Sequence, residues 1–230
     1  MTLSDFDAHL IGHGNGREEP LKITHTIPKE HFLIPSHYES EVASVLIPNG
    51  LLRDRIERLA ADIRKFYSPN DTIHLICLLK GSRGFFAELV AVLNRIYRYT
   101  DGQAVAPFKE YYVRLKKDPN HPGHIHAVSD DLTELRGGNV LIVEDLVDTG
   151  ATLSKFCRQV LDIKPKSLRV ASLLEKRNEK GEVAFKADFV GFSIPNLFVV
   201  GYCMDLQERF RDLEHMVLLN DEAFDKYKKV

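Results

Sequence analysis

Cysteine is scarce in this sequence of 230 residues, which contains only Cys77, Cys157 and Cys203. The number is odd, the three residues lie far apart, and each sits in an apolar run. This pattern predicts buried, reduced thiols and argues against a disulfide framework or a zinc cluster. Reduced thiols are typical of a reducing, cytoplasmic compartment.

Long apolar runs are also missing. No segment approaches eighteen consecutive apolar residues, and the first thirty residues carry Asp5, Asp7, Glu18 and Glu19 without a hydrophobic core segment. A membrane span and a signal peptide are therefore not expected. Lysine and arginine total 31 against 33 acids, a net charge of −2, so the composition gives no sign of attraction to nucleic acid or to a membrane surface.

Two common nucleotide-binding motifs are absent as well. Neither GxxxxGK[ST] nor GxGxxG occurs, which disfavours a nucleoside-triphosphate hydrolase and a dinucleotide-binding enzyme. No repeat and no linker rich in Gly, Pro or Ser divides the chain, and its 44% hydrophobic content is enough for a full core. We therefore expect a partly mobile N-terminal extension over residues 1–30 and a single domain over residues 31–230.

Apolar residues recur at helical spacing between 51 and 67, and residues 73–79, 80–84 and 85–97 read as strand, loop and helix. Further strands are predicted at 108–115, 168–174, 198–203 and 216–219, and a long polar connection at 116–131. Strands that alternate with helices predict an α/β fold with a mainly parallel, twisted sheet flanked by helices.

The most informative segment is NVLIVEDLVDTGATL, residues 139–153. Residues 139–143 have the pattern of a strand buried on both faces, so Glu144 and Asp145 are expected at its carboxyl end, where open α/β sheets bind ligands. Residues 149–152 then open an amphipathic helix whose free backbone N–H groups would face an anion. An ordinary helix cap and a solvated strand end are the plain alternatives for these residues.

This string closely resembles the phosphoribosyl-diphosphate motif of the type I phosphoribosyltransferases, in the form found in the hypoxanthine-guanine enzymes of purine salvage. Segments elsewhere extend the resemblance from about 46 to 227: LIPNG (46–50), LLKGSRGFF (78–86), ASLLEKR (171–177), ADFVGFSIPNLFVVGY (187–202) and FRDL (210–213). The segment LKGSRGFF is similar to the corresponding segment in the branch known from protozoan parasites, some of whose members accept xanthine. The resemblance implies a core at about 51–195 and a small hood from 31–50 and 196–230.

By the same resemblance, the chain would be a Mg²⁺-dependent transferase that joins hypoxanthine or guanine to 5-phosphoribosyl 1-diphosphate, with xanthine as a further candidate base. The resemblance implies acid-base chemistry for Asp148 and 5′-phosphate binding for Asp148, Thr149, Gly150, Ala151 and Thr152. It implies ribose and Mg²⁺ binding for Glu144 and Asp145, and diphosphate binding for Lys80, Gly81 and Arg211. Purine binding would fall to Lys176, Phe198, Val199 and Asp205, with Asp205 also a second Mg²⁺ contact. Taken singly, Lys80 and Arg211 are ordinary surface cations, Asp205 a turn residue and Phe198 a core strand residue.

Two positions depart from the family pattern. Ala151 stands where many relatives carry lysine, so a phosphate would rest on main-chain groups and helix polarity. Lys117 and Asp118 replace the usual Ser-Tyr pair of a mobile lid that excludes water from the reacting centre. The altered lid supports an alternative function, a catalytically weak purine-nucleotide-binding or regulatory homologue.

The resemblance also implies a homodimer or homotetramer, with apolar surface near Phe85 or Tyr97 as a candidate interface, and in relatives the peptide before Lys80 is often strained or cis. The sequence does not choose the oligomer size, nor whether xanthine is accepted.

Overall fold

The computed structural model describes residues 18–68, 70–99, 108–117, 125–128, 131–178 and 185–228, and for residues 117 and 125–128 it describes the backbone. The elements are, in chain order, β1 (Leu21–Lys22), β2 (Ile27–Pro28), η1 (Lys29–His31), β3 (Val42–Ile47), α2 (Asn49–Phe66), β4 (Ile73–Leu79), α3 (Arg83–Tyr99), β5 (Phe108–Lys117), β6 (Ile125–Val128), η2 (Thr133–Leu135), β7 (Asn139–Val147), α4 (Ala151–Asp162), β8 (Ser167–Arg177), β9 (Phe189–Pro195), β10 (Met216–Leu219) and α5 (Asp221–Lys228).

The main sheet has seven strands in the order β1-β9-β8-β7-β4-β5-β6. All neighbours are parallel except β5 and β6, which are antiparallel. Because β4, β7 and β8 run in the same direction, their carboxyl ends meet at one edge of the sheet. The predicted α/β fold with a mainly parallel sheet is confirmed.

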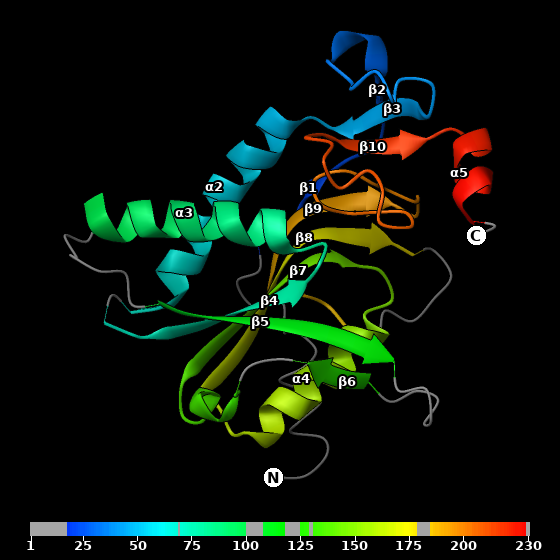
Figure 1. Cartoon of the computed structure of the whole chain (residues 1–230). Helices are drawn as coiled ribbons and strands as arrows, with labels where there is room; N and C mark the ends of the chain where they lie inside the picture. The colour runs from blue at the N-terminus through cyan, green and yellow to red at the C-terminus, as the bar shows by residue number, and fades with distance from the viewer. Residues whose placement is uncertain are drawn as a thin grey trace.

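Helices cover both faces of this sheet, with α2 and α3 on one side and α4 on the other (Figure 1). Side chains of β4 alternate accordingly: Leu75 and Cys77 join the cluster with α2 and α3, whereas Ile76 and Leu78 join the cluster with α4. A strand buried on both faces needs a continuous apolar run, which is why the sequence from 73 to 79 carries no alternation.

A second, antiparallel sheet of three strands, β10-β3-β2, forms a hood above the first (Figure 1). Its core contains Val42, Val45 and Val217 together with Phe210 and Tyr227, so segments from both ends of the chain build it. Between β9 and β10 lies an irregular segment that carries Phe198, Asp205 and Arg211, three of the predicted site residues.

Several elements differ from the sequence-based expectations. The helix at 51–67, the strands at 73–79 and 216–219 and the helix after Gly84 are found, the last beginning two residues early at Arg83. The polar connection at 116–131 is wrong in part, because β5 continues to Lys117 and β6 pairs with it. The predicted strand at 198–203 is wrong: the structure has only isolated bridges there, and the strand in this region is β9.

The thiols behave mostly as predicted. All three are free; Cys77 and Cys157 are buried, and burial raises the pKa of the Cys77 thiol to about 12. Cys203 departs from the prediction, since it is half-buried. None of the helices in the described part of the chain is long and apolar enough to cross a membrane.

Candidate active site

Glu144 and Asp145 lie inside β7, not beyond its end as the sequence suggested. Pairing between β7 and β8 continues to Val147, opposite Glu175, whereas pairing between β7 and β4 stops at Val143, opposite Cys77. The two acids therefore belong to a strand that is still held on one side and free on the other. This arrangement fixes their backbone and leaves space toward the residues that follow β4.

The fully buried Ser82 fills part of that space and ties the two acids together. Its hydroxyl donates to Glu144 Oε1 at 3.2 Å and accepts the Asp145 N–H at 3.0 Å, while Glu144 Oε1 accepts the same N–H at 3.0 Å. The pKa of Glu144 is raised well above its usual value, mainly by burial and secondly by the adjacent Asp145 carboxyl. Two acids that disfavour each other's charge in this way form a favourable site for a divalent cation.

Gly81 packs directly against Asp145. A Cβ atom placed on Gly81 would lie 1.7 Å from Asp145 Oδ2, so no larger residue fits without moving the carboxylate. The peptide between Leu79 and Lys80 is cis. Residues 80–82 thus form a tight turn after β4 whose glycine and serine both contact the acidic pair on β7.

Asp148 lies just beyond β7, beside the end of β8. Lys176 Nζ is 3.5 Å from Asp148 Oδ2, and the Asn178 side-chain amide donates to Asp148 Oδ1 at 3.2 Å and to its backbone carbonyl at 3.1 Å. The Lys176 side chain is only 10% exposed, whereas that of Asp148 is 53% exposed. A shielded cation therefore approaches one oxygen of an accessible carboxylate, and an amide holds the other.

Residues 149–152 form the predicted turn into a helix. Gly150 has φ 74°, a left-handed conformation, and a Cβ there would lie 2.6 Å from Phe185 Cβ, so only glycine suits the position. The N-cap residue of α4 is Gly150, which has no side chain to cap the helix, and the Thr149 hydroxyl accepts the Ala151 N–H at 3.4 Å. Thr149, Ala151 and Thr152 are exposed. The N-terminal N–H groups of a twelve-residue helix consequently face an open surface.

Lys80 and Arg211, the two cations expected at the diphosphate, share one carboxylate that the sequence reading overlooked. Glu208 Oε1 accepts from Lys80 Nζ at 2.8 Å, and its Oε2 accepts from Arg211 Nε at 3.2 Å. Hydrogen bonds from Lys80 and Arg211 hold the pKa of Glu208 below its usual range. The contact joins the turn after β4 to the segment between β9 and β10.

Asp205 belongs to the same cluster. Its Oδ1 lies 2.7 Å from Arg211 Nη2, and its Oδ2 accepts the Glu208 N–H at 2.8 Å. Within the described residues, no three His, Cys, Asp or Glu side chains gather as a metal group, and the role of Asp205 as a second Mg²⁺ contact stays a prediction. Magnesium commonly uses one or two carboxylates and takes its other ligands from water and substrate phosphates, and the acidic pair fits that pattern.

Phe198 is 44% exposed, which excludes the alternative that it is only a core strand residue. Its ring packs edge-on against Phe224 of α5, with centroids 5.1 Å apart, while Val199 beside it is buried. An aromatic side chain braced on one side and open to solvent is suited to stack on a flat ligand.

The lid residues fall largely outside the described part of the chain. Lys117 contributes only its backbone, as the last residue of β5 opposite Ile125, and Asp118 is not described. The effect of these two residues on closure of the lid therefore stays a prediction.

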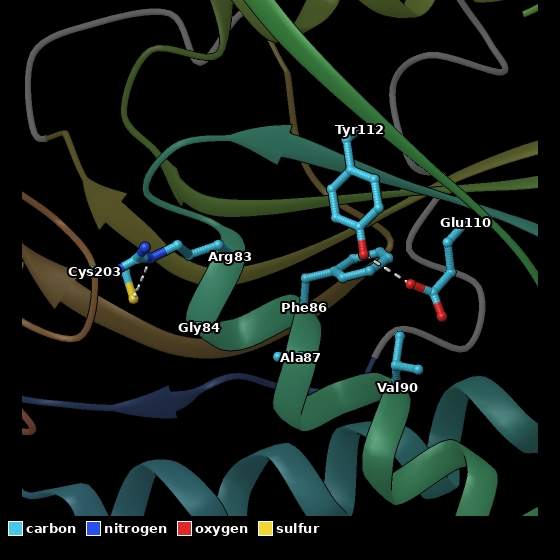
Figure 2. A pocket seen from close by; sticks show the side chains of 8 residues that line it. All are labelled: Arg83, Gly84, Phe86, Ala87, Val90, Glu110, Tyr112 and Cys203. Atoms are coloured by element: carbon cyan, nitrogen blue, oxygen red, sulfur yellow. Dashed lines mark hydrogen bonds between the residues drawn. The ribbon is translucent and has the colours of Figure 1, made fainter. Parts of the chain in front are cut away.

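A pocket of about 490 Å³ lies beside α3 and contains none of the predicted site residues (Figure 2). It is lined by Arg83, Gly84, Phe86, Ala87, Val90, Glu110, Tyr112 and Cys203. In Figure 2 the Arg83 guanidinium points to the Cys203 sulfur, 3.3 Å from Nε, at one end of the pocket, and Tyr112 donates to Glu110 at the other. Phe85 and Tyr97 are themselves buried, whereas Tyr99, two residues after Tyr97, is 77% exposed, so the expected apolar surface near these residues stays a prediction.

Three contacts of the site were missed from sequence: Ser82, Asn178 and Glu208. Each lies within three residues of a predicted residue, namely Gly81, Lys176 and Arg211. Proximity to these residues was the available signal, but their contact partners, Glu144, Asp148 and Lys80, are far away in the chain, and only the folded sheet brings them together.

Similarity to known proteins agrees with this geometry. Residues 46–207 match the phosphoribosyl transferase domain family. The chain is 50% identical over 202 residues to hypoxanthine-guanine-xanthine phosphoribosyltransferase of Plasmodium falciparum, covering 86% of this chain and 87% of the relative. It is 43% identical over 200 residues to hypoxanthine-guanine phosphoribosyltransferase of Homo sapiens, covering 86% of this chain and 90% of the relative.

A solved structure has the same fold. The crystal structure of hypoxanthine-guanine phosphoribosyltransferase from Schistosoma mansoni, in complex with IMP, matches with a TM-score of 0.77 and 35% identity, over 91% of this chain and all of that chain. The family match covers most of the chain, and the curated relatives are covered almost end to end. The chain therefore belongs to the type I phosphoribosyltransferase family, in its hypoxanthine-guanine phosphoribosyltransferase branch.

Proposed function

We propose that this chain is a purine-salvage enzyme that transfers a 5-phosphoribosyl group from 5-phosphoribosyl 1-diphosphate to a 6-oxopurine, releasing diphosphate. The observation that carries the proposal is the pairing of Asp148 with Lys176 at the carboxyl ends of β7 and β8. The two curated relatives described above bear the names of enzymes with this activity. The alternative of a binding or regulatory homologue rests on the altered lid pair in the sequence, and the comparisons give it no support.

The Asp148 and Lys176 pair is complementary to one edge of a 6-oxopurine. In guanine and hypoxanthine, N7 and the 6-oxo oxygen lie side by side on that edge. A carboxylate next to an ammonium group can accept the N7 proton while the ammonium donates to O6. Adenine carries an amino group instead of the oxygen, so it would leave the shielded Lys176 cation unpaired, which explains a preference for 6-oxo bases.

The reaction needs a proton acceptor at N7 as N9 attacks C1 of the ribose and the C1–O bond to diphosphate breaks. Asp148 suits this role because its carboxylate is accessible and is oriented from both sides by Lys176 and Asn178. The free base gives up its N7 proton to the carboxylate, and the bonding electrons of the broken bond leave with diphosphate. A positioned base of this kind typically contributes about 10²- to 10⁴-fold to the rate.

Phosphate recognition rests on the turn into α4. Thr149 and Thr152 offer hydroxyl groups, and the backbone of residues 149–152 offers N–H donors at a helix N-terminus, so the 5′-phosphate can be held without a lysine at Ala151. The Phe198 ring would stack on the purine, with the backbone at Val199 next to its pyrimidine side.

Mg²⁺ would be held by Glu144 and Asp145, where it would offset the charge of the diphosphate and ribose oxygens. Lys80 and Arg211 would bind the diphosphate itself. We propose a cytoplasmic location on the basis of the three free thiols. The assembly as a homodimer or homotetramer stays a prediction.

The test is a spectrophotometric assay with 5-phosphoribosyl 1-diphosphate, Mg²⁺ and, in turn, guanine, hypoxanthine, xanthine and adenine. We expect turnover of guanine and hypoxanthine, little with adenine, and a loss of about 10²- to 10⁴-fold in Asp148→Asn. Asp54→Asn, at an exposed position of α2, is the matched control and should retain full activity. Binding of guanosine monophosphate without turnover in the unaltered protein would contradict the proposal.

A further inference from the structure

The Glu208 carboxylate spans the two cations that the proposed function assigns to diphosphate. One oxygen contacts Lys80 and the other contacts Arg211, at 2.8 Å and 3.2 Å. A carboxylate and a phosphate group both present oxygen acceptors in a fixed geometry to such cations. Glu208 thus occupies the donors that a diphosphate oxygen would use.

The backbone around Glu208 aims its side chain at this position. Gln207 and Glu208 both have left-handed backbone conformations, with φ 53° and 62°. Residues with a Cβ adopt this region rarely, and it persists where surrounding contacts hold it. Here the contact is specific, since the Glu208 N–H donates to Asp205 Oδ2.

Arg211 shows which of its partners is replaceable. Its three nitrogens already have partners: Nη1 donates to the Cys203 carbonyl at 2.6 Å, Nη2 pairs with Asp205, and Nε pairs with Glu208. The Cys203 carbonyl is part of the main chain, and Asp205 is 30% exposed, whereas Glu208 is 60% exposed. An incoming anion therefore reaches the Arg211 Nε most readily by displacing Glu208.

The charge of the cluster leads to the same conclusion. Lys80 and Arg211 supply two positive charges, and Asp205 and Glu208 supply two negative charges. With all four in contact, no net positive charge remains to attract diphosphate. Once the Glu208 carboxylate swings away, the cluster carries a net positive charge that favours an anion.

We propose that Glu208 is an internal anion of the diphosphate site. Its carboxylate positions Lys80 and Arg211 while diphosphate is absent, and it releases both cations when diphosphate binds. The inference rests on the proposed function, because that function makes these cations the diphosphate ligands. By competing for both cations, Glu208 weakens diphosphate binding and speeds the departure of the product. It is a positioning residue and touches no reacting atom.

The experiment is calorimetric titration of the full chain with inorganic diphosphate in excess Mg²⁺, comparing unaltered protein with Glu208→Gln. We expect roughly 3- to 10-fold tighter binding in the variant, the scale set by two exposed ion pairs. The gain should shrink at 1 M salt, where charges are screened within about 3 Å. The KM for 5-phosphoribosyl 1-diphosphate should fall in parallel with the dissociation constant of diphosphate.

Two further variants test whether the effect is specific to Glu208 and to its charge. Glu57→Gln removes an acid from another exposed pair, with Arg95 on α3, and should leave diphosphate binding unchanged. Glu208→Asp keeps the charge on a shorter side chain and should bind diphosphate more weakly than Glu208→Gln. Unchanged or weaker diphosphate binding in Glu208→Gln, with normal binding in the unaltered protein, would overturn this inference alone. Failure of the unaltered protein to bind diphosphate would overturn the proposed function as well.

Discussion

Lys176 Nζ lies 3.5 Å from Asp148 Oδ2, across the ends of two adjacent parallel strands. The contact bears on the stability of the Lys176 cation and on the proposed binding of a purine base. Lys176 is only 10% exposed, and a shielded cation without a counter-charge is costly, so Asp148 stabilises it before a base arrives. In the proposed complex, the O6 of a 6-oxopurine would be an additional acceptor for the ammonium group and its N7–H would be a donor to the carboxylate. The proposed function would thus have the Asp148 and Lys176 pair arranged as the complement of the base before the base binds.

Asn178 is expected to position Asp148 for proton transfer. Replacing it with alanine removes the donor to Asp148 Oδ1 and to the Asp148 carbonyl, while Lys176 still holds the other oxygen. Because a hydrogen bond to a charged group is worth about 1.5 to 3 kcal/mol, Asn178→Ala should lower kcat roughly 10-fold. Steady-state kinetics with hypoxanthine should show the loss in kcat with little change in KM. Asn70→Ala, an exposed turn residue before β4, is the control; equal effects of the two variants would rule out this role.

Gly81 is expected to tolerate no side chain. Gly81→Ala would place a Cβ 1.7 Å from Asp145 Oδ2 and push that carboxylate out of place. A displacement of about 1 Å at a catalytic centre can cost 10²-fold, so we expect at least that loss of kcat/KM, together with weaker Mg²⁺ binding measured by titration. In Gly50→Ala nothing lies within 4 Å of the new Cβ, and its α2 location should give full activity and a gain in stability of up to about 1 kcal/mol. Full activity in Gly81→Ala would contradict the close packing.

The replaced lid pair can be tested by restoring it. The double substitution Lys117→Ser and Asp118→Tyr should raise turnover, because a tyrosine over the reacting centre excludes water and completes the site. Single-turnover and steady-state rates, measured with guanine, separate faster chemistry from faster product release. An unchanged rate would show that this chain closes its site by other means.

The carboxyl ends of the parallel strands were the predictable part of the site. A run of apolar residues without alternation marked β4 and most of β7, and once the sheet is parallel, Asp148 and Lys176 must end at the same edge. The segment after β9 was not predictable in this way. FVVGYC has strand composition, but Gly201, at φ 93°, and the left-handed Tyr202 and Cys203 turn the chain away after a single bridge from Val200 to Val217.

That turn also explains why the contact of Glu208 with Lys80 and Arg211 was missed. Composition gives no warning that several residues between Tyr202 and Phe210 take left-handed conformations, yet these bends carry Asp205 and Glu208 toward Arg211. Likewise β9 was overlooked because Gly191 and Ser193 interrupt its apolar run, although Gly191 is required there: a Cβ would lie 2.7 Å from the Leu173 carbonyl. Close backbone contacts of this kind become visible only in the folded chain.

Glu41 is expected to give the protein a pH-dependent stability. Its carboxylate, 12% exposed, accepts from Lys226 at 2.9 Å and from the Tyr227 hydroxyl at 2.6 Å, and so anchors α5, whose Phe224 braces Phe198. Burial by itself would raise the pKa of Glu41, but the hydrogen bonds from Lys226 and Tyr227 outweigh it and leave that pKa below 4.5. A lowered pKa means that the charged form is favoured in the folded state.

The stabilisation from Glu41 should therefore be complete above about pH 4.5, the ordinary value, and should disappear as the pH falls through the lowered pKa. At pH 7, Glu41→Gln should reduce the free energy of unfolding by about 1 kcal/mol, measured by urea denaturation, and at pH 3 the two proteins should be nearly equal. Because α5 supports Phe198, the variant should also raise the KM for the purine base at pH 7 more than it changes kcat. A stability difference that persists undiminished at pH 3 would show that Glu41 acts through packing and not through its charge.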